Sequence, residues 1–308
     1  MKKLLNLALL IFFSQFFCGS YLCGAENRFG FVGFFGDKGV QEGEFEEPAG
    51  ISVDINGCIY IADAGNHRIQ KFSERGNFIE YRGGLGWSGE NFDKPVDIFA
   101  KSVLDIFVTD QNAHRIVRFD KDLNYISSLG LNDISNNELV FGYPSGISVS
   151  RRGDIFVVDG ENKRIIKINS FGEPEMSFGG FENLDFGLNE PFQVAVSSDN
   201  NIFVSDFSSG RVLVFDYFGN FSFEIFNKKM KSAAGIDIDN YGRVFIADPM
   251  SASVYVFNLK GLYLFTITGN EIGGGEIFKE PIDIVFYKGL LYVLDRSQKR
   301  VYILKEKN

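Results

Sequence analysis

The sequence predicts an all-β protein, a six-bladed β-propeller that an N-terminal strand closes by completing the last blade. Three observations predict this fold. A unit of about 47 residues recurs six times along the chain. Each unit contains short segments rich in β-branched and aromatic residues, separated by turn-forming residues. The last unit lacks one strand, and an extra strand-like segment precedes the first unit.

The repeat is clearest at an aspartate that ends one strand-like segment in every unit. Such segments read Ile-Tyr-Ile-Ala-Asp or Ile-Phe-Val-Thr-Asp, and their aspartates are 47, 49, 47, 42 and 47 residues apart. Self-similarity at this spacing indicates one structural unit repeated along the chain. The six aspartates are Asp63, Asp110, Asp159, Asp206, Asp248 and Asp295.

Other positions keep the same spacing from the aspartate. A proline stands 15 residues before the first four aspartates and 14 before the last, while Ala233 replaces it in the fifth unit. An arginine follows five residues after every aspartate except Asp248. In the first unit, strands are expected at Ile51 to Val53, up to Asp63, from Arg68, and after a turn at Gly76. Units of about 40–50 residues with four strands are typical of propeller blades.

The two ends of the chain predict how the ring closes. The sixth unit stops at Asn308, directly after its third strand. The segment from Arg28 to Phe35 resembles the fourth strands of the other units and precedes the first proline. We therefore expect it to pair with the last unit, which removes an exposed sheet edge. The 34 phenylalanines are expected to fill the interfaces between blades.

Residues 1–25 are predicted to be a signal peptide, and residues 26–308 the propeller. Lys2 and Lys3 precede an apolar run of residues 4–17, and a cleavage site after Ala25 follows. Two alternatives stay open, a retained N-terminal anchor and lipidation at Cys18 or Cys23. The protein is accordingly expected to be exported, and periplasmic, secreted or associated with the envelope. Cys58 is expected to be a buried small hydrophobic residue.

The charge of the chain argues against a nucleic acid as partner. The whole chain carries a net charge of −9. Without Lys2 and Lys3, 29 basic residues face 40 acidic ones, which brings the propeller near −11. An acidic surface repels phosphate backbones and anionic membranes. Membrane contact is expected only through a lipid anchor at the N-terminus.

One unit also resembles a known repeat family. The segment Asp63-Ala64-Gly65-Asn66-His67-Arg68-Ile69, together with Pro48 to Ile51 before it, resembles the NHL repeat. The resemblance covers roughly residues 28–308 and is specific for the fold. It implies an RNA- or protein-binding module, a sensor or scaffold domain, or, in a few cases, an enzyme such as a peptide-amidating lyase.

The recurrent aspartates and arginines allow a structural and a functional interpretation. Because they recur in nearly every unit, we expect each aspartate to hold its own loop and to pair with its arginine. A ring of charged ligands is the alternative. His67 and His114 occupy equivalent places in adjacent units, and no further histidine is present to complete a zinc or copper site. The similarity to the lyases therefore does not extend to their metal ligands.

The candidate ligand site lies two residues after the proline position. Asp97, Gln193 and Asp283 stand there in the second, fourth and sixth units, whereas the other three units have glycine. In a ring, these polar groups converge at one level of the central channel. They are candidates to bind a polar ligand or calcium. The alternative is that they hydrogen-bond exposed strand ends and water. No other cofactor is expected.

Trp87, the only tryptophan, lies in the glycine-rich segment Gly83 to Gly89 between the first two blades. An exposed Trp87 could anchor a protein partner or stack on a sugar. It could also fold back onto the ring as a plug.

The sequence favours a non-enzymatic binding module or scaffold outside the cytoplasm, which uses its inter-blade loops to hold a protein, peptide or glycan. No catalytic residue is singled out. A propeller-type hydrolase or lyase, in one version calcium-dependent, is the alternative, and a structural envelope component is a third. The identity of the partner and the oligomeric state stay open.

Overall fold

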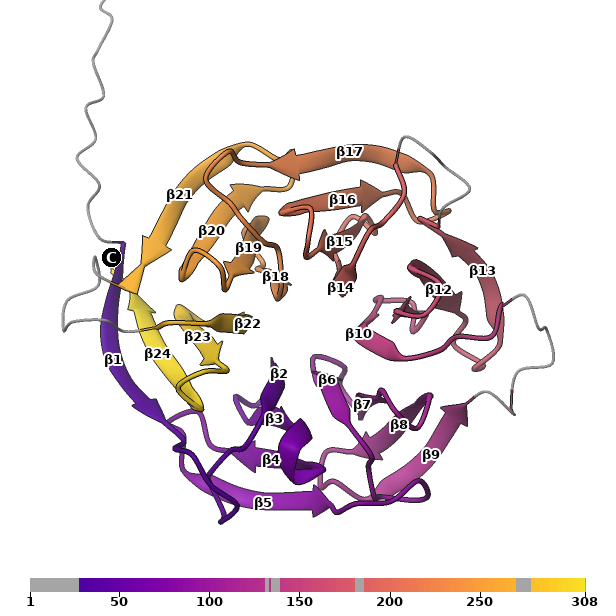
Figure 1. Ribbon diagram of the computed structural model, residues 1–308, viewed down its shortest axis with the longest axis vertical. Coiled ribbons are helices and arrows are strands. Elements are labelled where there is room, and N and C mark those ends of the chain that lie inside the picture. The colour runs from indigo at the N-terminus through magenta and orange to yellow at the C-terminus, as the bar shows by residue number, and fades with distance from the viewer. Residues whose placement is uncertain (1–27, 131–132, 134–138, 181–185, 270–277, 308) are drawn as a thin grey trace, which may run out of the picture.

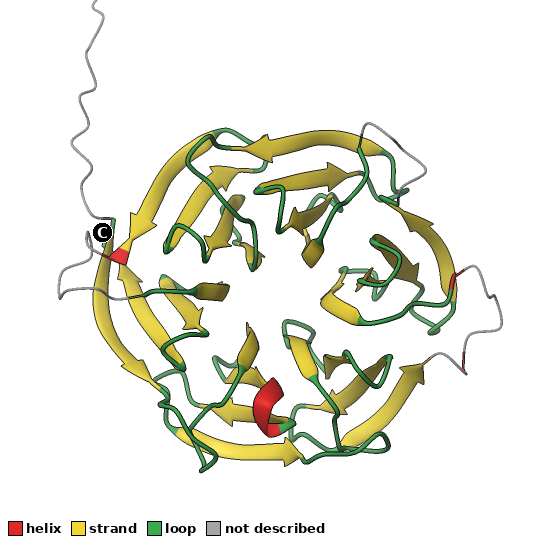
Figure 2. Cartoon of the chain, viewed as in Figure 1, coloured by secondary structure: helices red, strands yellow, loops and turns green. Residues whose placement is uncertain are grey.

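Six four-stranded antiparallel sheets stand radially around one axis in the computed structural model of the protein (Figure 1). The structure describes residues 28–130, 133, 139–180, 186–269 and 278–307. Strands make up nearly all of the regular structure, as Figure 2 shows. The 3₁₀ turn η1 (Ala64–Asn66) in blade 1 is drawn in red there. The predicted six-bladed β-propeller is confirmed.

Each blade runs from an inner strand beside the axis to an outer strand at the rim. Blades 1 to 3 consist of β2 (Pro48–Val53), β3 (Ile59–Asp63), β4 (Arg68–Phe72), β5 (Phe78–Gly83); β6 (Pro95–Phe99), β7 (Asp105–Asp110), β8 (Arg115–Asp120), β9 (Tyr125–Gly130); β10 (Pro144–Val149), β11 (Ile155–Asp159), β12 (Arg164–Ile168), β13 (Pro174–Phe178). Blades 4 to 6 consist of β14 (Pro191–Val196), β15 (Ile202–Asp206), β16 (Arg211–Phe215), β17 (Phe221–Phe226); β18 (Ile236–Ile238), β19 (Arg243–Asp248), β20 (Ser253–Asn258), β21 (Tyr263–Thr268); β22 (Pro281–Tyr287), β23 (Leu290–Asp295), β24 (Arg300–Glu306), β1 (Phe29–Phe35).

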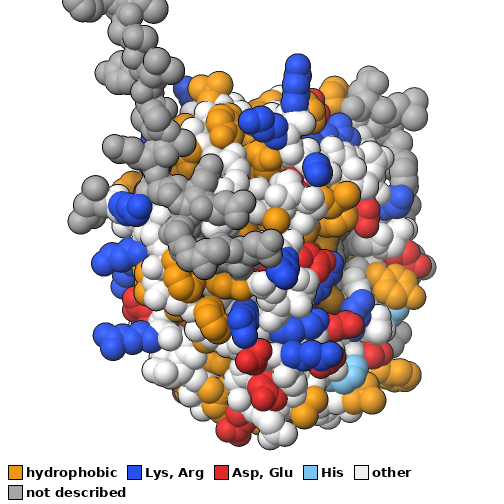
Figure 3. All heavy atoms as spheres, turned by 60° about the vertical axis from the view of Figure 1, so that its left-hand side comes forward, with side chains coloured by type: hydrophobic (Ala, Val, Ile, Leu, Met, Phe, Trp, Pro, Cys, Tyr) orange, Lys and Arg blue, Asp and Glu red, His pale blue; other side chains and the backbone are white. Residues whose placement is uncertain are grey.

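The N-terminal strand closes the ring as predicted. β1 pairs antiparallel with β24, from Phe29 opposite Glu306 to Phe35 opposite Val301. The outer strand of the last blade therefore comes from the start of the chain, so that unfolding of blade 6 requires both ends to separate. Figure 3 shows this side of the ring, where basic side chains lie beside acidic and apolar ones.

The inner strands begin earlier than the sequence predicts. β2 starts at Pro48 rather than at Ile51, and Pro48 lies opposite Asp63 before the register shifts at Gly50. Proline is tolerated at the first position of a strand because its missing N–H is not needed there. A register shift also follows the proline in blades 2, 3, 4 and 6.

Aromatic and aliphatic side chains fill the wedges between blades. The position three residues before each proline site is at most 5% exposed in all six blades. Burial of one such side chain contributes about 1.5–3 kcal/mol. These residues are Phe45, Phe92, Phe141, Leu188, Met230 and Phe278. The expectation that Cys58 is buried is wrong. Cys58 lies directly before β3 and is half-buried.

The repeated aspartate holds the loop that leads into its own blade. Asp63 is fully buried, and its carboxylate accepts hydrogen bonds from the backbone N–H of Glu46 at 3.0 Å and from Arg68 Nε at 3.1 Å. Arg68 also donates to the carbonyls of Val40, Gln41 and Glu44. Equivalent ion pairs join the aspartate and arginine in blades 2, 3 and 4. In these four blades the geometry agrees with the structural interpretation of the repeated pair. In blade 6 the expected pair is wrong, because Arg300 pairs with Asp37.

These loops define one face of the ring. The loop face carries the inter-blade loops, such as residues 84–94, and the loops that begin at the repeated aspartates. The turn face is the opposite side, with tight turns such as residues 54–58 and 73–77.

Glycine in the inner strands allows neighbouring blades to approach each other. A Cβ atom on Gly146 would stand 2.4 Å from Gln193 Cα, too close for any real contact. We predict that Gly146→Ala lowers the free energy of unfolding by about 1–3 kcal/mol, because backbone must shift to make room.

The control is Gly33→Ala in β1, where a Cβ would meet nothing within 4 Å. It should change the free energy of unfolding by less than about 0.5 kcal/mol. Thermal or urea unfolding measures both variants, and equal stability of the two would contradict the close approach.

Candidate functional site

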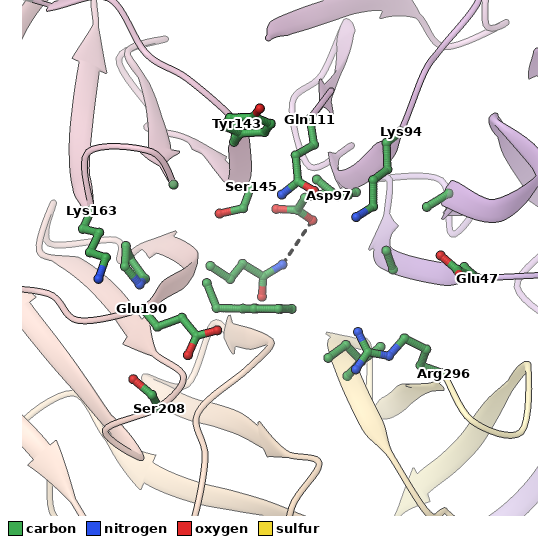
Figure 4. Close-up of a pocket in the computed structure, with 18 of the residues that line it drawn as sticks. Glu47, Lys94, Asp97, Gln111, Tyr143, Ser145, Lys163, Glu190, Ser208 and Arg296 are labelled. Atoms are coloured by element: carbon green, nitrogen blue, oxygen red, sulfur yellow. Dashed lines mark hydrogen bonds between the residues drawn. The ribbon is translucent and has the colours of Figure 1, made fainter. Parts of the chain in front are cut away.

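The structure brings the three predicted polar residues together at the axis. Asp97, Gln193 and Asp283 lie on β6, β14 and β22, the inner strands of alternate blades. They are 5%, 8% and 1% exposed. Gln193 Nε2 donates to Asp97 Oδ1 at 3.1 Å across the channel, as the dashed line in Figure 4 shows. We refer to these three residues as the axial clasp.

Each member of the axial clasp accepts a hydrogen bond from the next blade. Innermost strands are sheet edges, so the N–H groups that face the axis have no partner within their own sheet. The N–H of Ile51 donates to Asp283 Oδ2 and that of Ile147 to Asp97 Oδ2, both at 2.8 Å. The N–H of Ile236 donates to Gln193 Oε1 at 2.6 Å. Three of the six blade junctions are joined in this way.

The other three junctions explain the alternation with glycine. A Cβ on Gly50, Gly146 or Gly235 would lie 2.4–2.7 Å from the Cα atom of the clasp residue in the adjacent blade. One side of each clasp residue therefore needs glycine as a neighbour, while its side chain reaches the blade on the other side. The alternative interpretation, in which the polar groups bind strand ends, accounts for this geometry. A ligand role for them stays a prediction.

Burial makes the two carboxyl groups hard to ionise. Loss of solvent raises the pKa of Asp97 to about 7, although hydrogen bonds from Ile147, Ile98 and Gln193 oppose the rise. Burial and the nearby charge of Asp97 raise the pKa of Asp283 well above its ordinary value. Because the charge of Asp97 acts on Asp283, the two carboxyl groups resist simultaneous ionisation.

The clasp oxygens are largely occupied by backbone donors. Asp97 Oδ1 also accepts from the N–H of Ile98, and Asp283 Oδ1 from that of Ile284, both at 2.8 Å. Within the described ranges, no group of three or more His, Cys, Asp or Glu side chains is arranged to hold a metal ion. Calcium at this position stays a prediction.

The axial clasp separates two hollows along the channel. The loop-face cavity has a volume of about 810 Å³, and Asp97 and Gln193 form its floor. The hollow on the turn face has a volume of about 1020 Å³. An ion pair between Lys101 of blade 2 and Asp237 of blade 5, which stand opposite each other in the ring, crosses that hollow. Gln193 lines both hollows, so the axial clasp lies between them.

Three rows of repeat positions line the loop-face cavity, and sequence reasoning missed them. The rows lie immediately before the proline site, immediately after it, and immediately after the repeated aspartate. The proline and the aspartate of each repeat are structural, whereas the residues beside them differ from blade to blade. That variation is the sequence signal that could have indicated these lining residues. The rows contribute Glu47, Lys94, Tyr143 and Glu190; Ala49, Val96, Ser145, Phe192 and Ile282; and Ala64, Gln111, Gly160 and Arg296.

Trp87 lies on the loop face and is 75% exposed. Its Nε1 donates to Asp93 Oδ2 at 3.1 Å, which holds the ring against its own loop. The interpretation of Trp87 as a plug on the ring is therefore wrong. Its exposure is compatible with contact to a partner, which stays a prediction.

Comparison with known proteins agrees with the repeat architecture. A family model of the NHL repeat matches residues 45–72 and 141–168, in blades 1 and 3. The protein brain tumor of Drosophila melanogaster is 30% identical over 188 residues, which are 60% of this chain. The B-box type zinc finger protein ncl-1 of Caenorhabditis elegans is 52% identical over 44 residues, 14% of this chain.

The chain is an NHL-repeat β-propeller. It spans 13% of the length of brain tumor and 5% of that of ncl-1. Virginiamycin B lyase from Staphylococcus aureus has a similar structure, with a TM-score of 0.61, 18% identity, and coverage of 84% of this chain and 94% of the lyase chain. A chain of the nidogen/laminin complex gives a TM-score of 0.57 at 17% identity, covering 73% of this chain and 81% of that one. At these identities the two structures share the fold alone.

The Asn-His segment of this NHL propeller has a structural role in blade 1. Asn66 Nδ2 donates to Asp63 Oδ2 at 2.7 Å and to the carbonyl of Gly39 at 3.0 Å. His67 Nδ1 contacts the carbonyl of Asp93, and His114 Nδ1 accepts from the N–H of Tyr143 at 3.0 Å. Both histidines thus fasten the loop of the next blade, and neither lines the loop-face cavity.

The raised pKa values make a prediction about pH and stability. A carboxyl group whose folded pKa exceeds its unfolded value binds more protons when folded, so stability falls as pH rises through the interval between the two values. We predict that the melting temperature of the NHL propeller falls by about 2–6 °C between pH 5 and pH 8. Asp97→Asn should reduce this fall, even if it changes the absolute stability.

Asp199→Asn, an exposed position on the turn face, is the control and should leave the fall unchanged. Differential scanning calorimetry at several pH values measures the melting temperature of each variant. A wild-type melting temperature that rises between pH 5 and pH 8 would contradict the charge assignment.

Proposed function

We propose that this chain is an exported, non-enzymatic binding module or scaffold that holds a protein, peptide or glycan on its loop face. The observation that carries the proposal is the loop-face cavity. Its floor is fixed by the axial clasp, and its walls consist of the positions that vary from blade to blade. A rigid frame with variable lining is suited to selective binding.

The rim of the loop face supports the proposal. Trp87 and Leu85 are 75% and 70% exposed in the loop between blades 1 and 2, and Val40 is 63% exposed in the loop before blade 1. Exposed apolar side chains on one face are typical of sites that bind a partner. The family resemblance implies protein or RNA binding, and the net charge of −9 favours the protein.

Export rests on the sequence of residues 1–25, which lie outside the described residues. We propose cleavage after Ala25 or lipidation at Cys18 or Cys23, so that any membrane contact is made through the N-terminus. Over the described ranges, no helix is both long and apolar enough to cross a bilayer.

A hydrolase or lyase is the second candidate, in one version calcium-dependent, with polar residues at the channel mouth. The same fold is found in an enzyme: a catalytically inactive variant of virginiamycin B lyase with quinupristin gives a TM-score of 0.63 over 90% of this chain at 16% identity. Against it, neither histidine reaches the loop-face cavity, and the clasp carboxylates are engaged by backbone N–H groups.

A photo-crosslinking experiment tests the binding function. We predict that benzoylphenylalanine in place of Trp87, in the full-length chain, crosslinks to a specific partner from envelope extract. The same residue at Phe171, which is 88% exposed on the turn face, is the matched control.

Adducts at position 87 that exceed those at position 171 at least tenfold are expected. Adducts only at position 171 would place the partner on the other face. Steady turnover of a substrate that depends on Asp97 would favour the enzyme instead.

A further inference from the structure

The loop-face cavity has one corner that offers hydrogen-bond donors. Blades 2 and 3 place Lys94, Gln111, Tyr143 and Ser145 around it, as Figure 4 shows. Lys94 and Gln111 are half-buried, and neither side chain makes a hydrogen bond or ion pair with any residue that the structure describes. An ammonium group and a primary amide without partners are suited to receive an anionic acceptor.

Ser145 adds an unsatisfied group to the same corner. Its Oγ is buried and lacks a hydrogen-bond partner among the described residues. The backbone is held in place, because Thr109 Oγ1 donates to the Ser145 carbonyl at 2.6 Å. A buried hydroxyl without a partner costs free energy, which a ligand acceptor would recover after a rotation about the Cα–Cβ bond.

Tyr143 forms the rim of the corner in a strained conformation. Its φ angle is +46°, which is rare for a bulky residue. The hydrogen bond to His114 Nδ1 and the contact of the two rings, with centroids 4.4 Å apart, hold it there. Strain of this kind persists only where the surroundings enforce it, and it fixes the Tyr143 ring beside the donors.

An apolar patch also lines the cavity. Ala49 and Ala64 come from blade 1, Phe192 from blade 4 and Ile282 from blade 6. The Phe192 ring is supported by Phe207, with centroids 5.8 Å apart. An apolar group would bury its surface here, whereas the hydroxyl groups of a sugar would lose hydrogen bonds to water.

The charges that line the cavity favour a ligand with a single negative charge. Glu47 and Glu190 line it together with three basic residues, Lys94, Lys163 and Arg296. Arg296 is already paired with Glu280. The two glutamates oppose the binding of a dianion such as a phosphate, whereas the buried Asp97 on the floor is hard to ionise. A monoanionic carboxylate can take the donors of Lys94, Gln111 and Ser145.

We propose that the loop-face cavity binds the free C-terminal carboxylate of a peptide whose last side chain is apolar. The carboxylate lies in the corner between blades 2 and 3, and the last side chain packs against Phe192 and Ile282. This inference rests on the proposed binding function and names its ligand class. A volume of about 810 Å³ is in the usual range for a small-ligand site, so the last few residues of a chain fit.

Two peptide pools test the proposal on the full-length chain. Both are random octapeptides with a biotinylated N-terminus, and they differ only in a free carboxylate or an amide at the C-terminus. We expect at least tenfold greater retention of the carboxylate pool, with enrichment of apolar last residues. Lys94→Met should remove this preference, and Ser145→Ala should weaken retention about three- to tenfold. Lys94→Gln is the second variant should Lys94→Met not fold.

Lys288→Met on the turn face is the matched control and should bind like the wild type. Equal retention of both pools, or a preference for acidic oligosaccharides over the carboxylate pool, would overturn the proposal. If neither pool is retained while position 87 still crosslinks to a partner, the C-terminal inference fails and the binding function stands. If both experiments are negative, the binding function fails too.

Discussion

The innermost strand of every blade leaves backbone N–H groups facing the axis, and these groups need acceptors. A propeller sheet has no neighbour on that edge, so an acceptor must come from outside the sheet's own backbone ladder. Asp97, Gln193 and Asp283 supply it to Ile147, Ile236 and Ile51 of the next blade. Each of these bonds joins two blades at the axis, and the pairing of β1 with β24 joins the two ends of the chain at the rim.

The same constraint shapes the functional surface. Since the proline, aspartate and arginine positions fix each blade, the residues immediately beside them are free to vary. Lys94, Ser145 and Phe192 are such residues, and each comes from a different blade. The clasp lies between the loop-face cavity and the turn-face hollow. The proposed binding at the cavity uses side chains at these variable positions.

Much of the fold could be predicted from the sequence, because blades related by rotation place equivalent residues at one level. The spacing of the aspartates gave six blades, and the resemblance of residues 28–35 to a fourth strand gave the closure. The convergence of Asp97, Gln193 and Asp283 at the axis could be predicted because they occupy equivalent positions in three repeats. Hydrogen-bond partners did not follow, since the bond from Ile147 to Asp97 depends on how closely two blades approach. The exposure of Trp87 also could not be predicted, because it depends on a local contact with Asp93.

Hydrogen exchange at three backbone amides tests the axial clasp most directly. The N–H groups of Ile51, Ile147 and Ile236 have no partner in their own sheets, and the three residues line the turn-face hollow. If the clasp joins the blades as described, NMR will show these amides exchanging only through global unfolding, as slowly as the amide of Val204 in a central strand. Exchange of the three amides orders of magnitude faster than that of Val204 would contradict the account.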